Sequence, residues 1–323
     1  MGVGKWVFTG LAVGIVGLIT LGPYEPVDYD VSFDPAEFDD GVQAYFDRVE
    51  AAFDDIRPDS AKRVIWAGAP ETRTPVSIVY MHGFSASSQE IRPVPDTLAQ
   101  ALGANLIYTR FAGHGRTSDA MAEGTMQAWM QDAAEAMAAA RAVGDEVIII
   151  STSTGGTIAA LVLLDDALSA DVKGAIFVSP NFGINNPMSP LLTMPAARYW
   201  VPLIGGKRRS FEPLNDAQAR EWTTEYPSAA VFPMAAMVKH ANAQDYAAVQ
   251  VPALFYYSDD DQVVRPDLTH GVVAEWGGPA TRIAPLLTEA DTPFAHVVAG
   301  DITAPAQTAP ATQAMLDWIN GLK

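Results

Sequence analysis

The sequence predicts an α/β fold, with a mostly parallel β-sheet covered by helices on both faces and one long insertion. From residue 61 onward, short runs rich in β-branched and aromatic residues alternate with longer helical patterns. The short runs are almost continuously apolar, which is typical of parallel strands buried on both faces. The hydrophobic fraction of 49% supplies a sizeable core.

The predicted elements follow one another in a regular order. Strands are expected at residues 63–66, 76–80, 105–108, 146–150, 175–178 and 253–257. Helical patterns cover residues 126–143, which Gly144 closes, and residues 154–168. A last surface helix is expected over residues 311–322, where Pro310 suits the first turn. The core of the fold is therefore assigned to residues 61–183 and 248–323.

An uncharged apolar run occupies residues 6–22, with Lys5 as its only basic flank. As a helix it would reach about 25 Å, close to the hydrocarbon thickness of a membrane. Three interpretations stay open: an uncleaved signal anchor, a cleaved signal peptide and a core helix. The exit through Leu21-Gly22-Pro23 is a poor cleavage site, so residues 1–22 are predicted to be an anchor. Lys5 precedes the apolar run and acidic residues follow it, which favours residues 23–323 on the outer side of the membrane (periplasmic or extracellular). If the segment is cleaved, the protein is expected to be secreted.

Acidic residues are concentrated in residues 23–60, which hold twelve Asp or Glu against Arg48 and Arg57. Interleaved aromatic residues predict that this extension packs on the body. The whole chain has a formal net charge of −18, which disfavours a nucleic-acid partner. Cysteine is absent, so disulfides, thiolate nucleophiles and Cys-ligated metals are excluded. No metal-ligand spacing occurs either, and we expect neither metal nor cofactor.

The regular alternation breaks at residues 184–247, which contain seven of the 23 prolines and four of the 11 methionines. An insertion of this length in a compact fold is usually a lid or a binding element. Its methionines and aromatics suit apolar ligands, although they could equally fill a small core of the insertion itself. The candidate substrate-binding residues here are Met188, Trp200, Met234 and Met237.

A serine follows the predicted strand 146–150 in the run Ser151-Thr-Ser153-Thr-Gly155, directly before a helical pattern. This matches the G-x-S-x-G turn that exposes a nucleophilic serine, with Ser151 in place of the first glycine. The helix N-terminus behind Ser153 offers backbone N–H donors to a developing oxyanion. The alternative is a Ser/Thr-rich helix cap with no chemistry.

Further motifs favour the nucleophile. The run His82-Gly83-Phe84 follows strand 76–80, so the N–H groups of Phe84 and Thr154 could form an oxyanion hole. Three aspartates follow strand 253–257, and His296 comes later, in the chain order Ser, Asp, His. The spacing D-x-V-V selects Asp261 as the acid, with Asp259 and Asp260 as the alternatives.

These motifs together resemble the α/β-hydrolase superfamily over residues 61–323, and within it the serine esterases that include monoacylglycerol lipases and the serine aminopeptidase group. The resemblance implies the α/β-hydrolase fold, a helical cap at residues 184–247, and a nucleophile–base–acid triad of Ser153, His296 and Asp261. It also implies an oxyanion hole from the amides of Phe84 and Thr154.

The leading hypothesis is a serine ester hydrolase acting on a small-molecule ester. Peptide hydrolysis of the proline-releasing kind is the runner-up, and a catalytically silent binding protein is a third possibility. Four histidines outside the triad are interpreted as structural or ordinary surface residues: His82, His114, His240 and His270. Glu90 is interpreted either as an anchor for the loop Met81-His82-Gly83-Phe84-Ser85, which we call the oxyanion loop, or as an early-helix acid.

Overall fold

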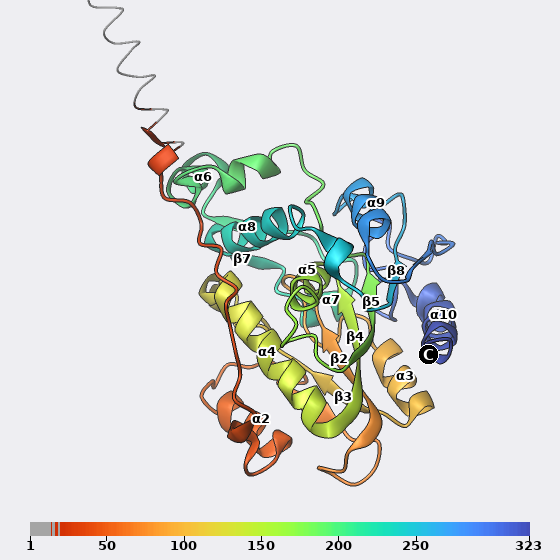
Figure 1. Ribbon diagram of the computed structural model, residues 1–323. Helices are drawn as coiled ribbons and strands as arrows, with labels where there is room; N and C mark the ends of the chain where they lie inside the picture. The colour runs from red at the N-terminus through yellow and green to blue at the C-terminus, as the bar shows by residue number, and fades with distance from the viewer. Residues whose placement is uncertain (1–13, 15–16, 19) are drawn as a thin grey trace, which may run out of the picture.

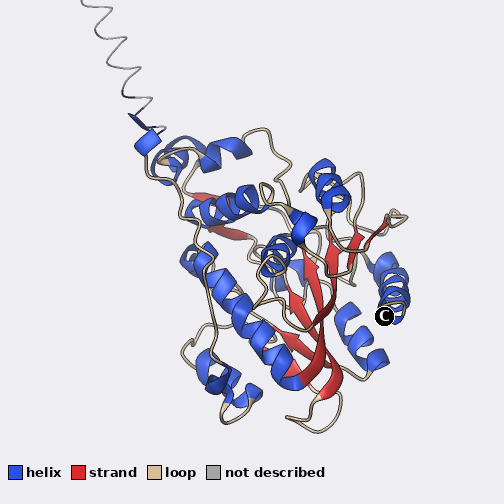
Figure 2. Cartoon of the chain, in the orientation of Figure 1, coloured by secondary structure: helices blue, strands red, loops and turns tan. Residues whose placement is uncertain are grey.

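The computed structural model describes residues 14, 17, 18 and 20–323. A seven-stranded sheet runs through its centre in the order β1-β3-β2-β4-β5-β8-β9 (Figures 1 and 2). Every neighbouring pair is parallel except β1 and β3. The strands are β1 Arg63–Ile65, β2 Thr74–Met81, β3 Asn105–Tyr108, β4 Gly144–Thr152, β5 Val172–Val178, β8 Ala253–Tyr256 and β9 Ala280–Ile283.

Helices cover both faces of the sheet, as the sequence predicts. One face carries α4 (Met126–Val143) and α5 (Thr154–Val162), whose side chains share an apolar cluster with alternate strand residues such as Ile149. The other face carries α3 (Val94–Leu102) and α10 (Thr308–Asn320), which pack on the remaining strand residues such as Ile148. The fold is therefore the predicted α/β architecture, with a mostly parallel sheet inside two layers of helices.

Several element boundaries differ from the predicted ones. The helix after Ser153 ends at Val162 rather than residue 168, because the chain turns there and leads into β5. The sequence patterns do not delimit helices α3 and α9 (Pro266–Glu275), and they do not predict the edge strand β9. Strand β9 is largely exposed, so it lacks the continuous apolar run that marks the central strands.

The insertion at residues 184–247 lies above the carboxyl ends of the parallel strands (Figure 1). We call this segment the cap. It contains helices α6 (Ala197–Gly205), α7 (Asp216–Glu221) and α8 (Val231–Ala241), together with a small antiparallel pair, β6 (Arg208–Ser210) and β7 (Glu225–Pro227). Helix α8 is the deepest cap element, and its side chains join the cluster around α4 and α5.

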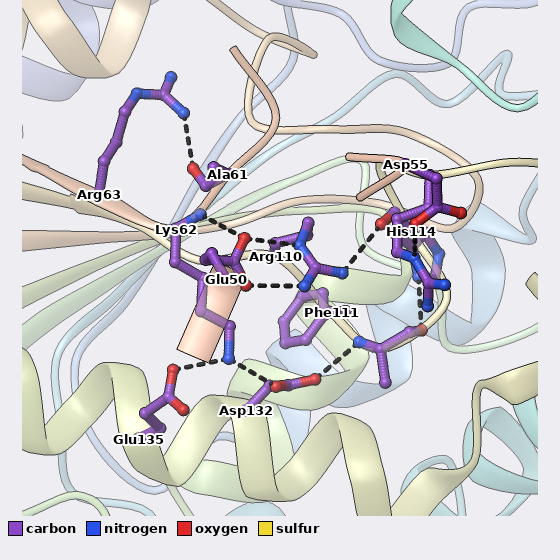
Figure 3. Close-up of polar contacts among 12 residues, drawn as sticks. Glu50, Asp55, Ala61, Lys62, Arg63, Arg110, Phe111, His114, Asp132 and Glu135 are labelled. Atoms are coloured by element: carbon purple, nitrogen blue, oxygen red, sulfur yellow. Dashed lines mark hydrogen bonds and ion pairs between the residues drawn. The ribbon is translucent and has the colours of Figure 1, made fainter. Parts of the chain in front are cut away.

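The acidic segment at residues 23–60 runs from the cap, past α8 and α4, to helix α2 (Val42–Glu50) (Figure 1). A buried ion-pair network fastens α2 to the core (Figure 3). Both Glu50 oxygens accept from Arg110, at 2.7 and 2.8 Å, and Lys62 lies 2.9 Å from Asp132 and 2.7 Å from Glu135. Removing one partner of a buried ion pair typically lowers the stability of a protein by about 3–5 kcal/mol. The part of the acidic segment around α2 therefore packs as part of the folded body.

No helix among the described residues is long and apolar enough to cross a membrane. The predicted anchor at residues 6–22 falls mainly outside the described part of the chain, which contains only its residues 14, 17, 18 and 20–22.

Candidate active site

Ser153 occupies a sharp turn between β4 and α5. Its backbone has φ 50° and ψ −118°, a conformation that costs energy for a residue with a side chain. A Cβ at Gly155 would lie only 2.1 Å from the Met81 carbonyl oxygen, so that position requires glycine. Ser151 tolerates a side chain because its Oγ donates to the Ile176 carbonyl at 3.0 Å. The departure from G-x-S-x-G therefore leaves the turn intact.

A chain of hydrogen bonds joins three distant parts of the sequence. Ser153 Oγ lies 3.0 Å from His296 Nε2, and His296 Nδ1 lies 2.8 Å from Asp261 Oδ2. Asp261 is 4% exposed, and its other oxygen accepts from the amides of Val263 and Val264 at 2.8 and 2.9 Å. The D-x-V-V spacing thus has a physical basis: the two valine amides orient the carboxylate.

The neighbouring aspartates lie elsewhere. Asp259 is exposed, and its Oδ1 forms an ion pair with Arg282 and a hydrogen bond with His270. Asp260 is exposed, and its amide donates to the Ser258 hydroxyl at 3.1 Å. Of the three aspartates, the structure brings only Asp261 to His296.

The two residues predicted to form an oxyanion hole lie at the same cavity as Ser153. Phe84 and Thr154 both line the cavity, and neither N–H has a hydrogen-bond partner among the described residues. Free amides beside a serine hydroxyl are the arrangement that stabilises a tetrahedral oxyanion. Gly83 keeps the two loops close, since a Cβ there would lie 2.6 Å from Glu90 Oε1 and 3.2 Å from Ser153 Cβ.

Glu90 lies beneath this loop and is 1% exposed. Its Oε2 accepts from the Gly83 amide at 2.6 Å and from the Tyr80 hydroxyl at 2.8 Å. Burial raises the pKa of Glu90 from 4.5 to about 7, against the lowering effect of these hydrogen bonds. The side chain also lines the cavity. Of the two interpretations of Glu90, the anchor for the oxyanion loop is the one that these contacts support.

A cavity of about 540 Å³ opens above Ser153, with core residues as its floor and cap residues as its roof. The roof is mostly apolar and is formed by Phe211, Leu214, Trp222, Tyr226 and Met234, with the polar residues Glu212 and Gln218. A cavity of this size and lining is typical of small-molecule sites.

Of the four candidate substrate-binding residues, the structure places only Met234 in the lining of this cavity, and the other three lie elsewhere. Met188 is 59% exposed, Met237 is fully buried in the cluster with α4 and α5, and Trp200 packs on the small core of the cap. The reason is that composition identifies an apolar segment, whereas the path of the chain decides which side chains face the cavity. Phe211, Trp222 and Tyr226 carried no local signal beyond being aromatic.

Two of the other histidines support the loops around the site. His82 Nδ1 lies 2.9 Å from the Gly83 carbonyl, and its Nε2 accepts from the Phe111 amide at 3.2 Å. The His114 ring packs on the rings of Phe84 and Trp129. Burial lowers the pKa of both, to about 4 for His114, so both stay neutral and structural.

His240 and His270 lie away from the triad. The His240 ring packs against the Tyr29 ring at a tilt, and His270 Nε2 lies 2.9 Å from Asp259 Oδ1. Within the described part of the chain, no cluster of three His, Asp or Glu side chains could hold a metal ion.

The roof is tied to both the acidic segment and the oxyanion loop. Arg57 donates from Nη1 to the carbonyls of Arg220 and Trp222, at 3.1 and 2.8 Å, and from Nη2 to that of Glu221. The amide of Thr223 donates to the Ser85 carbonyl at 2.7 Å, and the Tyr226 ring meets the Phe84 ring edge-on at 5.4 Å. Residues 220–226 of the cap are therefore held directly over the floor.

Comparison with known proteins places the chain in a family of hydrolases. The family model described as serine aminopeptidase, S33, matches residues 73–284. A thermostable monoacylglycerol lipase from Bacillus sp. strain H-257 is 24% identical over 197 residues, which are 59% of this chain and 73% of that protein.

Solved structures show the same fold at low identity. A structure reported for the metagenome-derived lipolytic enzymes LipS and LipT has a TM-score of 0.67 at 17% identity, covering 82% of this chain and 99% of that one. A soluble variant of monoglyceride lipase from Saccharomyces cerevisiae has a TM-score of 0.60 at 12% identity, covering 80% and 91%. Because the family model covers more than half of the sequence, the chain belongs to the serine aminopeptidase S33 family, and its architecture is the α/β-hydrolase fold.

Proposed function

We propose that this protein is a serine carboxylic ester hydrolase that acts on apolar or acyl-chain esters. The observation that carries the proposal is the hydrogen-bonded series Ser153–His296–Asp261 on the floor of an apolar cavity, beside the free amides of Phe84 and Thr154. The match to a monoacylglycerol lipase supports the same class of substrate.

The reaction proceeds through an acyl-enzyme. Ser153 Oγ attacks the ester carbonyl carbon while His296 Nε2 takes the hydroxyl proton, and Asp261 holds the imidazole in the tautomer that can accept it. The amides of Phe84 and Thr154 stabilise the tetrahedral oxyanion. His296 then gives its proton to the leaving alcohol, and a water molecule repeats the sequence to release the acid and regenerate Ser153.

A fluorophosphonate probe and a nitrophenyl ester series from acetate to palmitate test this proposal. The wild-type protein should be labelled and should prefer the longer, apolar acyl chains. Ser153→Ala should abolish both labelling and turnover, whereas Ser151→Ala, a buried serine two residues away, should keep them. Turnover by Ser153→Ala at the wild-type rate would refute the mechanism. An equal rate for all chain lengths would refute the acyl-chain preference, and a protein that the probe never labels would be a silent binding protein.

A second candidate is aminopeptidase activity, which one observation favours. A free α-amine needs a carboxylate in the pocket, and Glu212 on the cap lines the cavity. Hydrolysis of aminoacyl nitroanilides, proline nitroanilide included, that falls sharply in Glu212→Gln would support this activity. Unchanged or undetectable nitroanilide hydrolysis, alongside ester turnover, would exclude it.

We further propose that residues 6–22 attach the protein to a membrane, with the body on the outer side (periplasmic or extracellular). The uncharged apolar run and the acidic segment after it support this topology. If residues 6–22 are instead cleaved, the body is secreted. Mass spectrometry of the N-terminus of the mature protein distinguishes the two outcomes.

A further inference from the structure

The cap carries an unusual group of exposed apolar side chains. Among the described residues, the large apolar side chains with the greatest exposure include Leu21 at 87%, Leu203 at 78%, Ile204 at 72% and Tyr199 at 69%. Single exposed apolar residues are ordinary on a protein surface, but a group of them marks an interaction site. Three of these four belong to helix α6, and the fourth closes the apolar N-terminal run.

Helix α6 exposes these residues because its other side is already occupied. Ala197 and Val201 are 4% exposed and pack with Phe232 of α8 in the small core of the cap. Tyr199 and Leu203 are four residues apart, so they share the outward face of the helix. Ile204 lies in its last turn. No described segment covers this face.

The chain fastens its N-terminal run to this same helix. The amide of Ala196 donates to the Pro23 carbonyl at 2.7 Å, and Arg198 Nε donates to Glu25 at 3.0 Å. Residues 23–26 line a shared cleft with α6, and Gly22 lies next to Pro195, just before that helix (Figure 1). The apolar run 6–22 therefore ends where the exposed face of α6 begins.

Basic side chains accompany this face on an otherwise acidic protein. Lys207 follows α6 closely, Arg209 lies in β6, and Lys239 lines a cleft with Met194 and Tyr24. None of these three side chains has an ion-pair partner among the described residues. Apolar residues with a basic rim fit the surface of an anionic lipid bilayer. A second copy of this chain fits poorly, because each copy has a net charge of −18.

We propose that Tyr199, Leu203 and Ile204 form, with Leu21, one lipid-contacting face, so that the body rests on the membrane with its cap against the lipid. The inference rests on the proposed membrane attachment through residues 6–22, and it is independent of the ester chemistry. It assigns an orientation: the cap faces the bilayer, and the acidic segment around α2 points away from it. Negative charge on the part of the segment around α2 fits a position far from an anionic surface.

The absence of cysteine makes this orientation directly measurable. Leu203→Cys, in the full-length chain, is labelled with an environment-sensitive fluorophore and bound to vesicles of equal parts phosphatidylcholine and phosphatidylglycerol. The matched control is Leu286→Cys, a leucine that is 89% exposed in the loop after β9. The Leu203 probe should shift to shorter emission wavelength and be quenched by nitroxide-bearing lipids. The Leu286 probe should keep its aqueous spectrum.

Three results would overturn the proposal. Recovery of the protein with the vesicles while both probes keep their aqueous spectra would show attachment without contact at α6. The protein could fail to float with the vesicles at all. The Leu203 probe could also shift without vesicles, in step with protein concentration, which would assign the face to a second copy. Hydrolysis of a soluble short-chain nitrophenyl ester, measured on the same samples, reports the proposed activity separately.

A second variant tests the consequence for turnover. Leu203→Asp places a charge on the lipid-facing surface but lies outside the cavity, so hydrolysis of a soluble short-chain ester should be unchanged. Hydrolysis of a long-chain monoacylglycerol held in the same vesicles should fall several-fold relative to that of Leu286→Asp. Equal vesicle activities for the two variants would contradict a cap that rests on the lipid.

Discussion

The floor and the roof of the cavity are held in place by different kinds of contact. On the floor, Ser153, His296 and Asp261 are fixed by short hydrogen bonds to one another and to backbone amides. In the roof, side chains such as Trp222 and Met234 are placed by apolar packing and by backbone contacts to Arg57. Hydrogen bonds are directional and apolar packing is not. Changes in the floor should therefore abolish chemistry, whereas changes in the roof should alter stability and substrate preference.

The largest expected effect tests the floor. Asp261→Asn should lower kcat/KM for a nitrophenyl ester by about 10⁴-fold, because an amide opposite His296 Nδ1 favours the wrong imidazole tautomer. Asp260→Asn is the matched control and should change kcat/KM little, since Asp260 is exposed and does not contact His296. An equally large loss in Asp260→Asn would mean that the acid of the triad is misassigned.

A pair of cap methionines tests the roof. Met237 is fully buried in the core cluster, and Met237→Ala should lower the free energy of unfolding by about 2–5 kcal/mol in urea titrations. Met234 lines the cavity, so Met234→Ala should also raise KM for long-chain esters. If Met237→Ala shifted acyl-chain preference as much as Met234→Ala, contact with the cavity would not explain the effect of Met234 on substrate preference.

Arg57 of the acidic segment holds one turn of the roof in place. Arg57→Gln removes the charged donor to the carbonyls of residues 220–222, which should cost about 1–3 kcal/mol of stabilisation of this turn. Because the turn forms part of the roof, the variant should raise KM more than it lowers kcat. Arg73→Gln is the control, because Arg73 also donates to backbone carbonyls, at Arg141 and Gly144, but does not line the cavity. Identical values of kcat and KM for the two variants would show that Arg57 does not position the roof.

The smallest expected effect is on the pH dependence of the free energy of unfolding, through Glu90 beneath the floor of the cavity. Burial raises the pKa of Glu90 to about 7, so the folded protein favours the protonated carboxyl. This contribution to stability is complete below the ordinary value of 4.5 and is lost as the pH rises through about 7. Glu90→Gln, which stays neutral, should reduce the fall in unfolding free energy between about pH 5 and pH 8. The exposed Glu275→Gln should leave that fall unchanged, and a wild-type slope in Glu90→Gln would contradict the burial argument.

The sequence predicts the floor well for a local reason. The serine turn, the His-Gly-Phe loop and the D-x-V-V run each combine a short motif with the end of a strand. Because the strands are parallel, their carboxyl ends meet at one edge of the sheet, and motifs far apart in the chain converge there. The motif also specifies the partners of Asp261, since Val263 and Val264 supply the amides that orient it.

The roof was predicted only as a segment, because its side chains follow no short motif. Helix α8 buries Met237 and presents Met234 to the cavity, although the two residues are three positions apart and chemically identical. Trp200 turns into the small core of the cap, whereas Trp222 reaches the cavity from the turn that Arg57 holds. Composition identifies such residues as apolar but carries no information on direction.

By itself, the sequence determined the parallel α/β architecture, the position of the insertion, and the serine and histidine of the hydrogen-bonded series together with a run of three candidate aspartates. Each of these depends on local backbone preferences and on the convergence of strand ends. Only the tertiary structure decided which of three aspartates meets His296, which cap residues enclose the cavity and how Glu90 supports the oxyanion loop. These depend on contacts between segments far apart in the chain, and burial and direction are fixed only when those segments pack together.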